Sequence, residues 1–298
     1  MIASLLAMLL QAAAPSVAPR PSPPAATLPS DPLPSDPRPA DWIAIPDDEI
    51  VVFTLANGGT VSMRLAPAYA PEHVANIRRL VAARWWDKGA SVYRVQDNYV
   101  AQWGDASETK PLPAGIVARP PAEYQHTGAT AVQRLARRDP YAAWAGYSHD
   151  GWALAGDART EWLPHCYGTV GVARDLAPDT GSGAELYAAI GHGPRALDRN
   201  IAVVGRIVDG IERLSTLPRG TGELGFYTDA AQRVPIVSAR LASELPIAGR
   251  PRFQYRRTDN PRFAAWIGTR ENRSGPFFTV PAGGVDICAA PPPVRRAP

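Results

Sequence analysis

The 298-residue chain lacks several features that would point to a nucleic-acid or nucleotide partner. Its 31 Lys and Arg residues nearly balance 28 Asp and Glu residues, so the net charge is only +3. No Lys/Arg block dominates, and the pI of about 9.0 therefore overstates the case for nucleic-acid binding. A Gly-rich phosphate loop is also missing, and nothing indicates a nucleotide. We expect no nucleic-acid partner.

Cysteine is scarce, with only Cys166 and Cys288 in the chain. An exported protein could pair them, and closing so long a loop would contribute roughly 4–5 kcal/mol in the entropic view. Two independent thiols are the alternative, and the sequence leaves both open. We predict neither a metal site nor a cofactor, because zinc-ligand spacing is missing among the scattered histidines. These are His126, His149, His165 and His192.

No apolar run is long enough to span a membrane. Residues 1–14 form a short apolar run ending in small residues, as in a secretory signal, although no Lys or Arg precedes it. We interpret them as the signal peptide of a periplasmic protein, with no membrane insertion after cleavage. A plain hydrophobic N-terminus is the alternative. Residues 15–41 are rich in Pro, Ala, Ser and Asp, which predicts an extended, disordered tether.

The pattern then turns to short regular elements. Residues 49–55 and 60–65 are apolar runs separated by an Asn-Gly turn, a strong hairpin signal. Residues 71–81 have apolar side chains at helical spacing, with Pro in the first turn. We expect His73 of this helix to lie on the surface.

Residues 91–105 carry the most informative pattern in the chain. Val92, Arg94 and Gln96 alternate like one face of a strand, and residues 99–102 form a second strand after a polar turn. This arrangement can place an arginine, an aromatic ring and an amide on one surface. Only one of these groups is charged, so the surface suits an uncharged peptide better than a phosphate. An ordinary hairpin whose Arg and Gln face water is the alternative.

The same stretch resembles the cyclophilin family of peptidyl-prolyl isomerases. In that family an arginine precedes an aromatic-apolar-x-Gln run that ends in Gly-Gly-Asp, and here Arg94 precedes Tyr99-Val100-Ala101-Gln102-Trp103-Gly104-Asp105. Three further segments match the family in order: 167–174, 178–190 and 197–210. The resemblance covers about residues 50–241. It implies a mainly β fold, a closed antiparallel cyclophilin-like β-barrel capped by two helices.

The chain departs from the family in length. We expect an isomerase domain over residues 42–248, with an inserted loop region at about 106–165 that packs on one side of the barrel and is irregular or helical over residues 129–144. Residues 249–288 contain enough aromatic side chains to form a C-terminal extension packed on the barrel. Residues 289–298 are expected to be a disordered tail.

The resemblance implies cis–trans isomerisation of X-Pro bonds in unfolded or proline-containing polypeptides, by a monomer without a cofactor. Arg94 and Gln102 would be the catalytic residues. The substrate-binding residues would be Tyr99, Val100, Ala173, Arg174, Glu185, Tyr187, Leu197 and Ile201. The family's usual pocket tryptophan and histidine fall at Ala196 and Ile201, so we expect reduced activity. A non-catalytic chaperone or adaptor that grips proline-containing segments is the alternative function.

A rival motif is Asp179-Thr180-Gly181-Ser182, which spells the signature of an aspartic protease. That chemistry needs two close carboxylates that share a proton. No second Asp-Thr/Ser-Gly appears in the chain, so we interpret the segment as a Gly-rich turn.

Overall fold

The computed structural model describes residues 38–298, so the predicted signal peptide and most of the predicted tether lie outside the described residues. The end of the predicted tether is ordered: Pro39–Asp41 form a 3-10 helix. Asp41 is buried there and accepts a hydrogen bond of 2.6 Å from Arg262 Nε. The folded part therefore begins a few residues before Trp42.

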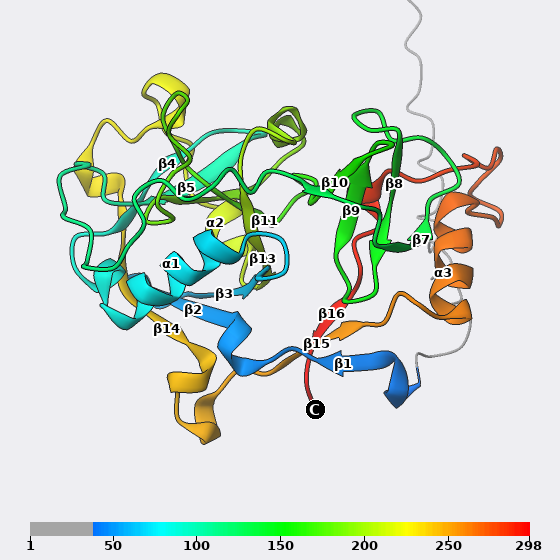
Figure 1. Cartoon of the computed structure of the whole chain (residues 1–298), viewed down its shortest axis with the longest axis horizontal. Helices are drawn as coiled ribbons and strands as arrows, with labels where there is room; N and C mark the ends of the chain where they lie inside the picture. The colour runs from blue at the N-terminus through cyan, green and yellow to red at the C-terminus, as the bar shows by residue number, and fades with distance from the viewer. Residues whose placement is uncertain (1–37) are drawn as a thin grey trace, which may run out of the picture.

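Eight antiparallel strands close into a barrel in the order β11-β12-β5-β4-β14-β2-β3-β13 (Figure 1). Their bounds are β2 (Ile50–Leu55), β3 (Thr60–Leu65), β4 (Ser91–Val95), β5 (Val100–Gly104), β11 (Thr169–Val172), β12 (Leu186–Ala189), β13 (Val203–Asp209) and β14 (Val234–Leu241). Two helices, α1 (Pro71–Ala82) and α2 (Glu212–Ser215), contribute apolar side chains to the barrel core. The predicted closed barrel with two helices is confirmed.

Helix α1 follows the predicted spacing and buries Val74, Ile77 and Leu80 in that core. The prediction for His73 is wrong, because its side chain is fully buried. Its Nδ1 lies 2.6 Å from Glu123 Oε2 and its Nε2 lies 3.1 Å from the Thr180 carbonyl oxygen. The inserted segment supplies Glu123, so the helix face that would otherwise meet water is covered.

The insertion is a second sheet, and the expectation of an irregular or helical loop region is wrong. Its strands, in the order β6-β10-β9-β8-β7, are antiparallel. They are β6 (His126–Thr127), β7 (Ala131–Arg134), β8 (Trp144–Ser148), β9 (Ala153–Gly156) and β10 (Thr160–Trp162). Trp152 and Leu163 pack against Tyr69 and Val203, so the sheet lies against one side of the barrel, as expected.

The C-terminal extension contacts both the barrel and the inserted sheet. Strand β15 (Phe253–Arg256) buries Phe253 against Ile50 of the barrel. Helix α3 (Pro261–Glu271) packs Phe263 on Tyr147 of β8, with ring centroids 5.1 Å apart. Figure 1 shows α3 on the far side of the inserted sheet from the barrel.

The predicted disordered tail is also wrong in part, because β16 (Val294–Arg296) pairs with β15. On its other edge β15 pairs with β1 (Trp42–Ala44), the first strand of the described chain. The tail is polar and Pro-rich, and its order comes from main-chain hydrogen bonds to an edge that the sequence pattern does not reveal.

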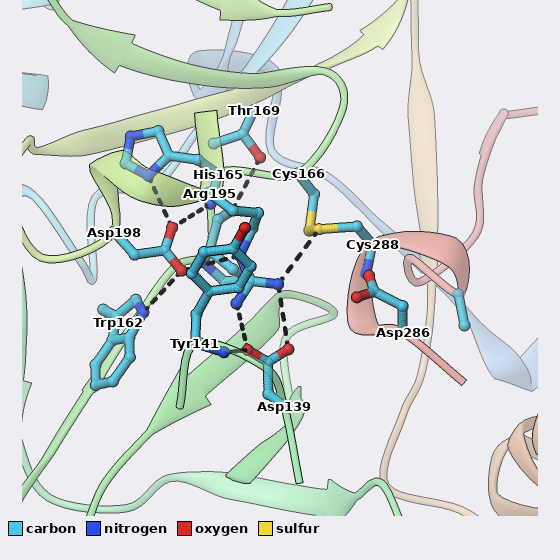
Figure 2. Close-up of a disulfide and its surroundings, with 12 residues drawn as sticks. Asp139, Tyr141, Trp162, His165, Cys166, Thr169, Arg195, Asp198, Asp286 and Cys288 are labelled. Carbon is cyan, nitrogen blue, oxygen red and sulfur yellow. Dashed lines mark hydrogen bonds and ion pairs between the residues drawn. A yellow bond between two sulfur atoms is a disulfide. The ribbon is translucent and has the colours of Figure 1, made fainter. Parts of the chain in front are cut away.

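The two cysteines form a disulfide, with an S–S distance of 2.04 Å (Figure 2). The bond joins Cys166, just after the insertion, to Cys288 in a short 3-10 helix, Ile287–Ala289. It settles the question that the sequence left open. None of the helices over residues 38–298 is both long and apolar enough to cross a membrane.

Candidate active site

Three neighbouring barrel strands bring the central predicted residues into one row. Arg94 of β4 pairs with Gln102 of β5, and Gln102 pairs with Tyr187 of β12. The register between β4 and β5 shifts between Val92 and Arg94. Val92 therefore lies in the barrel core while Arg94 does not, so the prediction that both share a face with Gln96 is wrong for Val92.

The Arg94 guanidinium is half-buried and held by three acceptors. Its Nε donates to the Leu224 carbonyl oxygen at 2.7 Å, Nη1 to Gln102 Oε1 at 3.0 Å, and Nη2 to Gln96 Oε1 at 2.5 Å. The Phe226 ring lies 5.3 Å from the guanidinium carbon. Burial lowers the pKa of Arg94, although a guanidinium stays charged. Each terminal nitrogen keeps a second N–H that can reach a substrate.

Gln102 is 7% exposed, and its amide is fixed from both ends. Its Oε1 accepts from Arg94, while Nε2 donates to the Tyr93 hydroxyl oxygen at 2.6 Å. The Tyr93 hydroxyl donates in turn to Glu185 Oε2 at 2.7 Å. Tyr93 is not predictable from the sequence pattern, because strict alternation places it on the opposite face from Arg94, whereas the register shift in β4 lets both side chains reach the same network.

A groove of about 430 Å³ adjoins this network and is lined by Gln102, Ala173, Arg174 and Glu185. Glu185 Oε1 accepts the Asp105 N–H at 2.6 Å. Burial raises the pKa of Glu185 to about 7, and the nearby Asp105 and Glu108 add to the rise. Gly104 makes room for the carboxylate: a Cβ there would lie 2.0 Å from Glu185 Oε2, at a φ of +153° that favours glycine.

Tyr187 is buried, and its hydroxyl lies 2.9 Å from His165 Nε2. His165 Nδ1 lies 3.1 Å from Asp198 Oδ1, and Arg195 donates to Asp198 at 3.0 Å and to Asp139 at 2.5 Å, as Figure 2 shows. Burial raises the pKa of Tyr187 well above its ordinary value. His165, predicted to be a core or loop residue, is a buried core residue with partners at both ring nitrogens.

The other predicted residues flank this row. The guanidinium of Arg94 lies 5.9 Å from the Tyr99 ring, and Val100 is buried at the start of β5. Leu197 and Ile201 are half-buried on the segment between β12 and β13. That segment passes the Tyr99 turn, where Gly193 N–H donates to the Asn98 carbonyl oxygen at 3.1 Å.

Two further hydrogen bonds hold the segment at Ala173 and Arg174 that lines the groove. Ala173 N–H donates to the Glu185 carbonyl oxygen at 2.9 Å, and Arg174 Nε donates to the Asn200 carbonyl oxygen at 3.1 Å. The protease-like motif is an irregular segment that follows a turn at residues 176–179, and the Asp179 side chain accepts from the backbone N–H of Asp175 and Gly181. Within residues 38–298, no three His, Cys, Asp or Glu side chains gather as a metal site would require.

Comparison with known proteins identifies this barrel. The family model described as cyclophilin type peptidyl-prolyl cis-trans isomerase/CLD matches residues 50–241. Probable peptidyl-prolyl cis-trans isomerases of Brucella suis and Brucella melitensis are each 26% identical over 178 residues, which is 59% of this chain and 74% of each relative.

Among solved structures, the chain is similar to the cyclophilin AquaCyp293 from Hirschia baltica. The TM-score is 0.66 at 25% identity, and the match covers 87% of this chain and 94% of that one. The coverage exceeds the span of the family model, so the likeness includes part of the added elements. The chain therefore belongs to the cyclophilin-type peptidyl-prolyl cis-trans isomerases.

Proposed function

We propose that this isomerase rotates X-Pro bonds at the surface formed by Arg94, Gln102, Tyr99 and Tyr187. The observation that carries the assignment is the Arg94–Gln102 pair, fixed on adjacent strands with guanidinium N–H groups to spare. Val100, Leu197 and Ile201 would complete an apolar hollow for the proline ring. Ala173, Arg174 and Glu185 would line the groove for the adjoining peptide.

The chemistry needs no nucleophile or metal. Rotation about a peptide bond breaks amide resonance and meets a barrier of about 18–20 kcal/mol. In the twisted state the prolyl nitrogen regains a lone pair, which a fixed guanidinium donor can bind more strongly than the planar amide. Gln102 holds a substrate carbonyl with its amide N–H. The half-buried setting of Arg94 strengthens its field at the reacting nitrogen.

We also propose that the chain acts in the periplasm on unfolded or proline-containing polypeptides. The apolar run at residues 1–14 supports export. The Cys166–Cys288 disulfide supports an oxidising compartment, because such bonds are rare where thiols are kept reduced. Mass analysis of the mature N-terminus tests the proposal, and a retained Met1 would contradict it.

Replacing Arg94 tests the catalytic assignment. We expect Arg94→Ala to lower kcat/KM for a proline tetrapeptide by roughly ten-fold or more, equivalent to about 1.4 kcal/mol of transition-state stabilisation. Arg94→Lys keeps the positive charge but loses the planar guanidinium with its two-pronged set of donors, so it should retain only part of the wild-type rate. Circular dichroism of both variants checks the fold. An unchanged rate in Arg94→Ala would refute the assigned role.

The second candidate function is the binding of proline-containing segments without catalysis. Three hydrogen bonds already occupy the Arg94 guanidinium, and Ala196 and Ile201 stand in place of the family's usual pocket tryptophan and histidine. In that case the wild-type chain would bind a proline-containing peptide, measured by fluorescence anisotropy, without accelerating its isomerisation.

A further inference from the structure

Glu185 and Arg94 are joined by hydrogen bonds that all run in one direction. Arg94 Nη1 donates to Gln102 Oε1, Gln102 Nε2 donates to the Tyr93 oxygen, and the Tyr93 hydroxyl donates to Glu185 Oε2. We call these four side chains the Glu185 relay. Each link is 3.0 Å or shorter, and the chain crosses strands β4 and β5 to the residue preceding β12.

We propose that Glu185 is a positioning residue: through the Tyr93 hydroxyl, its carboxylate sets the orientation of the Gln102 amide and so holds Arg94 in place. The inference rests on the proposed catalytic roles of Arg94 and Gln102. Glu185 acts through its neighbours, and its own oxygens face Tyr93 and the Asp105 N–H.

The orientation of the Gln102 amide follows from which atoms of the relay can accept a hydrogen bond. Glu185 Oε1 is committed to the Asp105 N–H, so a proton added to this carboxyl sits on Oε2, facing Tyr93. The protonated group then becomes a donor toward the Tyr93 oxygen. The Tyr93 hydroxyl hydrogen loses its acceptor, because its other neighbour, Gln102 Nε2, is also a donor.

The Gln102 amide cannot relieve this mismatch by turning over. A flip would offer Oε1 to Tyr93, but it would also point Nε2 at Arg94 Nη1, which is a donor. Protonation of Glu185 therefore loosens either the Tyr93–Gln102 link or the Gln102–Arg94 link. A buried donor without an acceptor costs free energy, so the loss of one hydrogen bond at Glu185 weakens the next ones along the relay.

The local charges place this change in the physiological range. Burial, with Asp105 and Glu108 close by, raises the pKa of Glu185 to about 7. The same groove is also lined by Lys110, Arg174, Asp175 and Asp179. Above that pH the carboxylate accepts from Tyr93 and the relay is complete. Turnover should therefore fall as the pH drops through about 7.

The test is the pH profile of kcat/KM for a proline tetrapeptide, measured by NMR exchange so that no coupled protease titrates. The kcat/KM of the wild type should rise from about pH 5.5 to about pH 8.5, following the ionisation of a single group. Glu185→Gln should be roughly fivefold slower at the upper end, the effect of about one hydrogen bond, with a flat profile. Tyr93→Phe should also flatten it, and the double variant should be no slower than the worse single one.

Glu108→Gln is the matched control, since it removes a nearby carboxyl that lines the same groove outside the relay. Its profile should keep a single ionisation, with the midpoint moved to lower pH because Glu108 helps to raise the pKa of Glu185. Thermal unfolding of each variant separates a positioning effect from a loss of fold. A wild-type profile that persists in Glu185→Gln would overturn the inference while leaving the isomerase assignment intact. Absence of turnover in the wild type at every pH would instead contradict the proposed catalytic function.

Discussion

The Tyr187 hydroxyl ties strand β12 of the barrel to a buried histidine. His165 Nε2 lies 2.9 Å from this hydroxyl and gives it a hydrogen-bond partner inside the protein. Burial of an unpartnered polar group costs free energy, so the two residues depend on each other.

We therefore expect Tyr187→Phe to lower the free energy of unfolding by about 1–3 kcal/mol, because His165 Nε2 loses its partner in a dry site. Urea denaturation measures the change. Tyr167→Phe is the matched control, since Tyr167 is exposed and its replacement should change stability by less than about 0.5 kcal/mol. Equal stabilities of Tyr187→Phe and wild type would show that the hydrogen bond contributes nothing.

At the scale of elements, Glu123 anchors the start of helix α1. Its carboxylate accepts the backbone N–H of Glu72 and His73 as well as contacting the His73 ring. Burial on its own would raise the pKa of Glu123, but these hydrogen bonds outweigh it and hold the pKa below its ordinary value. The carboxylate thus occupies the helix N-terminus, where negative charge is favoured.

A depressed pKa in the folded state means that Glu123 stabilises the protein above the pKa it has when unfolded, and that this contribution is lost as the pH falls through the folded value. Glu123→Gln should therefore unfold at a lower temperature than wild type at neutral pH, and the difference should shrink in acid. Calorimetry across the acid range measures it, with Glu72→Gln as the exposed control. A constant difference at all pH values would argue against ionic anchoring.

The sequence predicts some elements well for physical reasons. The β2–β3 hairpin and α1 were predictable because their apolar periodicity and turn residues agree with their final packing. The inserted sheet was not, since its short strands leave residues such as Val132 exposed and bury their other faces against distant segments. The strand predicted over residues 99–102 corresponds to β5, which carries Gln102. Tyr93 and Val92 could not be placed, because a β-bulge changes which side each faces.

At the scale of the whole molecule, the disulfide joins the connection between the inserted sheet and barrel strand β11 to the extension. Phe263 and Trp266 of α3 share an apolar cluster with Cys166 and with Ala145 of β8, so the covalent bond and the packing hold the same two segments together. The barrel alone is therefore not the unit of stability.

We expect Cys288→Ser to reduce the free energy of unfolding by about 4–5 kcal/mol in the entropic model, because the bond closes a loop with a sequence separation of 122 residues. The measurement is the urea midpoint with and without dithiothreitol. Reduced wild type should match Cys288→Ser, which should itself not respond to the reductant. A midpoint of the wild type that is insensitive to reduction would contradict this account.

The pairing of β1 with β15, and of β15 with β16, limits the order in which these strands can form during synthesis. Arg256, the neighbour of Trp42 across the ladder, is made more than two hundred residues after it, and the third strand, β16, follows β15. Until β15 is made, β1 lacks the partner on this edge. A copy that stops before Phe253 keeps that edge unpaired, and we expect it to be more susceptible to proteolysis than the longer chain.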